Sequence, residues 1–191
     1  VGNHDKPRIG SSAGKEYVRA LNMLLLTLPG TPTTYYGEEI GMVDVNISVI
    51  QDPAGQYDPS KSRDPQRTPM QWNNELNAGF SESLNGTWLD IASDYRTVNV
   101  EVQQDDTSST ISQYRALSLL RSSNVILSRG WFCYVWNDVN VFAYLRQMKI
   151  LRAEVISFRL DVQNDRWYTC WCSTGQEVSI NHTWLHKVSY I

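Results

Sequence analysis

The chain has 191 residues, of which 41% are hydrophobic and 19% are charged. This composition allows a sizeable buried core and excludes an intrinsically disordered chain. The formal net charge is -3 and no Lys/Arg cluster is present, which excludes a nucleic-acid-binding surface. Residues 23–28 form the longest apolar run, far short of the roughly 18 residues that span a membrane. Because the sequence has no initiator Met and no recognisable leader, we expect any targeting signal to precede Val1.

The first 40 residues are predicted to form a strand, a helix and a second strand. Residues 1–5, Val-Gly-Asn-His-Asp, place a histidine and a carboxylate at the carboxyl end of the first strand. Residues 11–12, Ser-Ser, supply a helix N-cap, and apolar residues then recur at helical spacing until Pro-Gly at 29–30. Residues 33–40 are rich in β-branched and aromatic types and predict the second strand. The pattern therefore predicts a right-handed βαβ unit with parallel strands.

Residues 42–99 are polar, rich in Pro, Gly, Asn and Asp, and lack periodicity, so they predict a long loop. Six apolar or aromatic residues within it favour an ordered loop that packs against the rest of the domain. They are Met70, Trp72, Phe80, Trp88, Leu89 and Tyr95. A second helix is predicted to follow residues 108–110, because apolar residues recur at helical spacing from Ile111 to Leu120.

Beyond Gly130 the hydrophobic period changes from helical to alternating. Residues 131–136 and 139–146, joined by Asn-Asp, predict a β-hairpin. Further strands are predicted at residues 153–160, 166–171 and 184–189. The sequence therefore predicts an α/β region followed by an all-β region.

The three cysteines, Cys133, Cys170 and Cys172, show no metal-ligand spacing, and buried thiols are their simplest interpretation. A bridge between Cys170 and Cys172 is disfavoured because residues two apart on a strand lie near the upper limit of disulfide geometry. A bridge from Cys133 to either of them stays open.

Three segments carry a family resemblance. They are Asn-His-Asp-Lys-Pro-Arg at 3–8, Thr-Thr-Tyr-Tyr-Gly-Glu-Glu-Ile-Gly-Met at 33–42, and Ser-Arg-Asp-Pro-Gln-Arg-Thr-Pro-Met-Gln-Trp at 62–72. Their order resembles the α-glucosidase (maltase) branch of glycoside hydrolase family 13, and the resemblance extends over residues 1–148. The third segment is specific enough to make coincidence an unsatisfactory explanation.

The resemblance implies the C-terminal part of a TIM (β/α)₈ barrel followed by a small antiparallel β domain. Because a barrel needs eight strands to close, the chain is expected to be a C-terminal fragment. We assign residues 1–129 to the last βα units and the long loop, and residues 130–191 to the β domain. The resemblance fades after Gln147, so the completeness of the β domain stays open.

The resemblance also implies a chemistry. Retaining hydrolysis of an α-glucoside needs a nucleophilic carboxylate and a general acid. In the family both lie on earlier strands, hence upstream of Val1. Asp5 matches the third family carboxylate, which stabilises the transition state, and His4 and Arg63 match residues that bind sugar hydroxyls. The implied ligand is an α-linked glucose oligosaccharide, and no cofactor or metal is expected.

The residues also admit structural interpretations. Asn3-His4-Asp5 could be an Asx-turn with an exposed His4, and Arg63 could form a surface pair with Asp64 or Asp58. Residues 67–72 are expected to lock the loop in place, with Trp72 as a buried anchor. Glu38 and Glu39 are expected to hold the strand end through hydrogen bonds and to take no part in catalysis.

A competing interpretation comes from the same family. Residues 79–82, 93–100, 117–120 and 130–133 resemble the heavy-chain subunits of heteromeric transporters of cystine and basic amino acids, which have abandoned hydrolysis. In the family that the chain resembles, those subunits have lost the Asn-His-Asp and Arg-Asp-x-x-Arg-Thr-Pro patterns. This chain keeps both patterns. The alternative would add a transporter light chain as partner. A sugar-binding module without activity is a weaker third interpretation, since it rests on aromatic content alone.

Asn46, Asn85 and Asn181 lie in Asn-x-Ser/Thr sequons, which are compatible with a secreted or cell-surface glycoprotein. A type II membrane anchor upstream of Val1 would be compatible with the same location.

Overall fold

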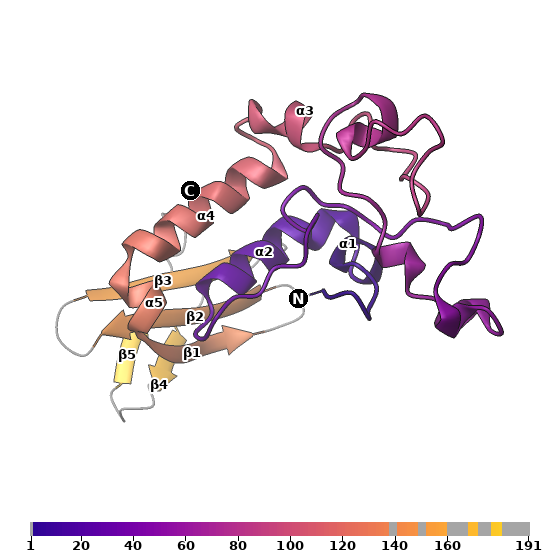
Figure 1. Cartoon of the computed structure of the whole chain (residues 1–191). Coiled ribbons are helices and arrows are strands. Elements are labelled where there is room, and N and C mark those ends of the chain that lie inside the picture. The colour runs from indigo at the N-terminus through magenta and orange to yellow at the C-terminus, as the bar shows by residue number, and fades with distance from the viewer. Residues whose placement is uncertain (1, 138–140, 149–151, 160–167, 172–176, 181–191) are drawn as a thin grey trace. The chain divides into compact units, whose positions relative to one another are not determined.

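The computed structural model describes residues 2–137, 141–148, 152–159, 168–171 and 177–180 (Figure 1). The chain divides into two compact units. The first comprises Val1–Leu26 and Pro32–Leu117, and the second comprises Thr27–Thr31 and Ser118–Ile191. The predicted boundary between residues 129 and 130 is a separate assignment by family resemblance, and it stays a prediction.

The predicted first helix is divided in two. Helix α1 spans Ile9–Ser12, the 3₁₀ turn η1 spans Lys15–Tyr17, and helix α2 spans Val18–Thr27. Residues 11–12 therefore end α1 and do not cap the longer helix, which corrects the prediction. Gly14 has φ 110°, a conformation that a right-handed helix cannot contain. The side chain that helix α2 buries between Val18 and Leu26 is a polar one, Asn22, whose amide donates to the Glu38 carbonyl at 3.1 Å.

The predicted strand at residues 33–40 is wrong, because residues 33–35 have no regular secondary structure and residues 36–40 form a turn. Within it, Ile40 N–H and Met42 N–H both donate to the Gly37 carbonyl, at 3.3 and 2.8 Å. Gly37 has φ 86°, and a Cβ added there would lie 2.5 Å from Met42 Sδ. A strand exists only through hydrogen bonds to a neighbour, and no described segment pairs with this one. The expected parallel βαβ pairing is therefore absent from the described residues.

The long loop predicted at residues 42–99 is confirmed. It contains four 3₁₀ turns, namely η2 Pro53–Gly55, η3 Pro59–Lys61, η4 Asp64–Gln66 and η5 Leu76–Gly79. Residues buried along the loop and beside it hold it in place: Met42, Met70, Ile40 and Ile111 form one apolar cluster in the first unit. A short helix that the sequence reasoning missed, α3 Val100–Gln104, follows the loop. Its N-cap is Asn99, whose Oδ1 accepts Val102 N–H at 2.8 Å.

The predicted second helix is confirmed as α4 Thr110–Ser123. Ser109 Oγ accepts the Ser112 N–H at 3.3 Å, and Ile111 and Leu117 are the buried residues of α4. Helix α5, Val125–Arg129, follows directly and buries Ile126 and Leu127.

The second unit contains antiparallel strands (Figure 1). Strands β1 Trp131–Asn137, β2 Val141–Met148 and β3 Arg152–Arg159 form one sheet in that order. Strands β4 Tyr168–Trp171 and β5 Glu177–Ile180 form a second, two-stranded sheet. The predicted hairpin and the strand near residues 153–160 are confirmed, whereas β5 was not predicted. The strand predicted at residues 184–189 lies outside the described residues.

Two buried side chains of β2 organise the second unit. Tyr144 is fully buried, and its hydroxyl contacts Thr27 Oγ1. Arg146 is also buried and donates to the carbonyls of Thr27 at 2.5 Å and Gly130 at 2.8 Å. Cys133 on β1 is disulfide-bonded, so the free-thiol interpretation is wrong at this position.

Candidate active site

His4, Asp5 and Arg63, which the sequence selected, lie together in the structure. Asp5 N–H donates to Asn3 Oδ1 at 2.8 Å, so the predicted Asx-turn forms and His4 is exposed. The same turn presents the Asp5 carboxylate to two guanidinium groups, Arg63 Nη1 at 3.3 Å and Arg67 Nη2 at 3.1 Å. His4 Nε2 lies 3.2 Å from the other carboxylate oxygen. The structural and the functional interpretations of this turn are therefore compatible.

The charges around Asp5 decide its ionisation. Partial desolvation favours the neutral acid, but the hydrogen bond from Arg63 and the charges of His4, Arg63 and Arg67 outweigh it. The net effect lowers the pKa of Asp5 below its ordinary value. Asp5 is therefore a carboxylate at neutral pH, as a group that stabilises positive charge must be.

The surface interpretation, in which Arg63 pairs with Asp58 or Asp64, is wrong. The Nε and Nη2 atoms of Arg63 donate to the two carboxylate oxygens of Asp52 at 2.7 and 2.8 Å, and its backbone N–H donates to Asp52 at 2.9 Å. The Asp52 side chain is only 1% exposed, and the hydrogen bonds from Arg63 hold its pKa well below the usual range. Asp64 instead accepts the N–H groups of Gln51 and Asp52, at 2.6 and 2.9 Å.

Arg67 contacts the same turn at two points. Its Nε donates to the His4 carbonyl at 2.9 Å, and its Nη2 reaches the Asp5 carboxylate. From the sequence, Arg67 was expected to lock the loop, and its contact with Asp5 was not predicted. The available signal was its place in the Arg-Asp-x-x-Arg-Thr-Pro pattern, four residues after Arg63.

Glu38 fixes the segment that precedes the turn. This buried carboxylate accepts Gly2 N–H at 2.6 Å and Tyr35 N–H at 3.1 Å. A Cβ on residue 2 would lie 2.7 Å from Glu38 Oε1, so a larger residue there would have to shift this carboxylate. The predicted hydrogen-bonding role of Glu38 is confirmed.

Two tyrosines connect the turn at residues 35–42 to the long loop. Tyr35 OH donates to the Gln66 carbonyl at 3.2 Å, and Tyr36 OH donates to the Thr68 carbonyl at 2.6 Å. Arg8 is buried and lies over both rings, 5.0 and 4.6 Å from their centroids. Burial raises the pKa of Tyr35 to about 12, so its hydroxyl stays a donor at neutral pH.

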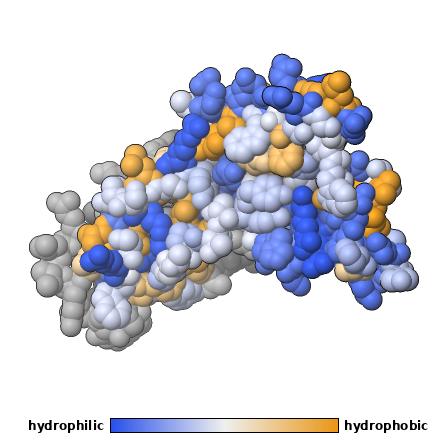
Figure 2. All heavy atoms as spheres, viewed as in Figure 1, coloured by the Kyte–Doolittle hydropathy of each residue, from blue (hydrophilic) through white to orange (hydrophobic). Residues whose placement is uncertain are grey.

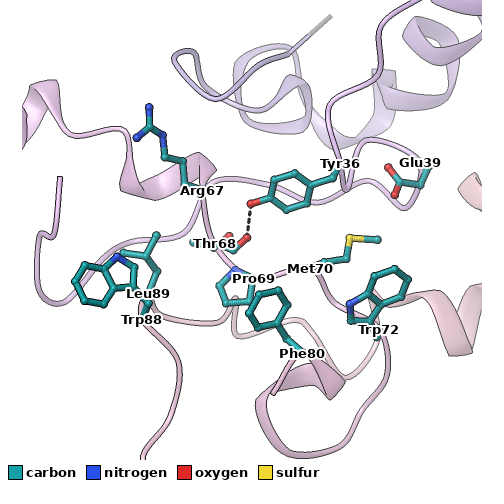
Figure 3. A pocket seen from close by; sticks show the side chains of 10 residues that line it. All are labelled: Tyr36, Glu39, Arg67, Thr68, Pro69, Met70, Trp72, Phe80, Trp88 and Leu89. Atoms are coloured by element: carbon teal, nitrogen blue, oxygen red, sulfur yellow. Dashed lines mark hydrogen bonds between the residues drawn. The ribbon is translucent and has the colours of Figure 1, made fainter. Parts of the chain in front are cut away.

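A pocket of about 530 Å³ lies beside this cluster (Figure 3). Tyr36, Met70, Trp72 and Phe80 contribute to its lining, and Trp72 is half exposed, so its expected role as a buried anchor is wrong. Trp88 and Phe80 are also exposed. Arg67 lines the pocket while its guanidinium points away from the aromatic rings, and Asp5 is not among the lining residues. Elsewhere on the face shown in Figure 2, hydrophobic side chains gather in separate patches among hydrophilic ones.

The lining of this pocket also includes an acid, Glu39. Desolvation raises the pKa of Glu39, and its Oε2 atom is buried without a hydrogen-bond partner in the part of the chain that the structure describes. Within that same part, no group of three or more His, Cys, Asp or Glu side chains is placed to hold a metal ion. None of the described helices is long and apolar enough to cross a membrane.

Comparison with known proteins places the chain in a family. Residues 1–130 match the model of the alpha amylase catalytic domain. The chain is 48% identical over 148 residues to the amino acid transporter heavy chain SLC3A1 of Rattus norvegicus, which covers 78% of this chain and 21% of that protein. It is 43% identical over 157 residues to maltase 1 of Drosophila virilis, with 78% and 24% covered. The crystal structure of trehalose-6-phosphate hydrolase from Bacillus licheniformis aligns with a TM-score of 0.70 at 31% identity, covering 78% of this chain and 31% of that one.

The chain belongs to the alpha-amylase family, glycoside hydrolase family 13. Its relatives in sequence include both α-glucosidases and transporter heavy chains, and its structural neighbours include a trehalose-6-phosphate hydrolase and a trehalulose synthase. The chain spans only 21% of the SLC3A1 protein and 24% of the maltase.

Proposed function

We propose that the protein carrying this chain is an α-glucosidase that removes terminal α-linked glucose from oligosaccharides with retention of configuration. Asp5 stabilises the transition state, His4 and Arg63 bind sugar hydroxyls, and the nucleophile and general acid lie on strands upstream of Val1. This chain by itself would then bind part of the sugar but not turn it over.

One observation supports this proposal above the others. Asp5 lies within 3.3 Å of His4, Arg63 and Arg67, although the two arginines are about 60 residues away in the sequence. The carboxylate is half exposed, so a ligand can reach it, and its lowered pKa keeps it charged. A fixed negative charge beside an oxocarbenium-like transition state lowers the barrier to its formation.

The test is Asp5→Asn in the full-length protein. Glucose release from maltose should fall on the order of 100-fold in kcat, because the loss falls on the transition state. The unfolding midpoint should change little, since the side chain is half exposed. Proton NMR of the first product should show the α-anomer. Equal kcat in the variant and the wild type would rule out the role of Asp5.

A second candidate function is the heavy-chain subunit of a heteromeric transporter of cystine and basic amino acids. The specific observation in its favour is the 48% identity to the SLC3A1 heavy chain, which exceeds the 43% to maltase 1. Under this proposal the protein sits at the cell surface behind an upstream type II anchor and joins a light chain. The discriminating experiment is co-expression with a light chain: amino-acid uptake that survives Asp5→Asn, with no glucose release, would favour the heavy chain.

A further inference from the structure

We propose that Asp52 is a positioning residue of the active site, which acts through Arg63 on the Asp5 carboxylate. The inference rests on the proposed function and extends it to a residue that no motif identifies. Asp52 lies 47 positions after Asp5 and makes no contact with it that would carry the effect directly.

Asp52 anchors one edge of the Arg63 guanidinium. Asp52 accepts three hydrogen bonds from Arg63, from the backbone N–H at 2.9 Å, Nε at 2.7 Å and Nη2 at 2.8 Å. Two parallel N–H donors on two carboxylate oxygens form the strong bidentate pair. The edge formed by Nε and Nη2, which is bound to Asp52, therefore fixes the plane of the guanidinium. The remaining nitrogen, Nη1, donates to Asp5 at 3.3 Å.

Asp52 is far more buried than the two residues that it is proposed to position. The Asp52 side chain is 1% exposed, whereas those of Arg63 and Asp5 are 39% and 49% exposed. Among these three residues, Asp52 is therefore the rigid one. Arg63 and Asp5 are the two that a ligand can reach. An arginine side chain has many rotamers, so without an anchor a half-exposed guanidinium would sample many positions.

Arg63 is one of several basic side chains around Asp5. Arg67 and His4 also face its carboxylate, so its charge stays compensated without Arg63. Asp52 thus fixes the direction in which the Nη1–H of Arg63 points. A binding site whose groups are held to within about 0.5 Å works better than a looser one.

Asp52 has a second contact that a purely structural role would explain. Its Oδ1 accepts Ala54 N–H at 3.1 Å and caps η2. Asp58 provides the matched control, because it also precedes a proline and caps a 3₁₀ turn, η3, through Ser60 N–H at 3.1 Å. Asp58 pairs with Lys61 instead of Arg63.

The experiment is a double-mutant cycle of D52N and R63A in the full-length protein, read as kcat/KM for maltose, with D58N as control. D52N should lower kcat/KM on the order of 10-fold in the wild-type background and leave it nearly unchanged in the R63A background. D58N should change it little. Equal losses from D52N in both backgrounds, or an equal loss in D58N, would overturn the inference.

A second measurement needs no turnover. The Arg63 Nε–H should exchange slowly with solvent in the wild type and on the order of 10-fold faster in D52N, because the 2.7 Å hydrogen bond is weakened. A wild-type protein that releases no glucose would refute the proposed function. The exchange rate would then test only whether Asp52 anchors Arg63. An unchanged exchange rate in D52N would overturn it.

Discussion

Glu38 Oε1 accepts the backbone N–H of Gly2 at 2.6 Å, although the two residues are 36 positions apart in the sequence. Its other oxygen accepts Tyr35 N–H at 3.1 Å. One buried carboxylate therefore fixes both the segment that leads to Asp5 and the turn that leads to the long loop. The position of Asp5 relative to Arg63 depends on this contact.

Glu38→Gln should destabilise the protein by about 1–3 kcal/mol, because an amide NH₂ would face a backbone N–H donor inside the protein. Urea unfolding of the full-length protein measures the difference. Glu75→Gln is the control, since Glu75 is exposed, and it should stay within about 0.5 kcal/mol of the wild type. A Glu38 variant as stable as the control would contradict the structural role of this carboxylate.

Asp52 should make the protein sensitive to acid. Its pKa is lowered from the ordinary 3.8, chiefly by the hydrogen bonds from Arg63. A group whose pKa is lower in the folded state stabilises above its unfolded pKa, and that stability is lost as the pH falls. The wild type should therefore exceed Asp52→Asn in free energy of unfolding at pH 7, and the gap should narrow below about pH 4. A gap that is constant from pH 7 to acid, measured by urea unfolding, would contradict this.

Arg146 should be a stability residue of the second unit. It is 1% exposed and donates to the carbonyls of Thr27 and Gly130, and burial lowers its pKa. Arg146→Ala should destabilise by about 2–4 kcal/mol, because it leaves buried carbonyls without donors and opens a cavity. The exposed Arg129 serves as control, and Arg129→Ala should change little. Similar thermal unfolding of both variants would contradict the assignment.

A location in the secretory pathway would predict glycosylation at Asn46 and Asn85. Both residues are exposed and lie in the long loop, so the loop can carry an N-linked glycan at either position. Protein expressed in animal cells should shift in gel mobility on treatment with a glycosidase, and the shift should shrink in Asn46→Gln and in Asn85→Gln. Protein with no shift would contradict a location in the secretory pathway.

The sequence by itself determined the family and the local elements that short-range patterns control. The alternation beyond Gly130 identified β1, β2 and β3, and helical spacing identified α4. The length of the loop followed from its lack of periodicity, and the motif residues His4, Asp5 and Arg63 did converge. The helix and the strands depend on residues a few positions apart, which a sequence displays directly. The contact between Asp5 and Arg63 spans 58 positions, and only the family resemblance implied it.

Only the tertiary structure decided the rest. Residues 33–40 have strand propensity, yet they form no strand because a strand requires a paired neighbour and Gly37 adopts a positive φ. Trp72 was expected inside and lies half exposed beside a pocket. The roles of Asp52 and Arg67 depend on contacts across 11 and 62 positions in the sequence, and no local pattern records which carboxylate an arginine will reach.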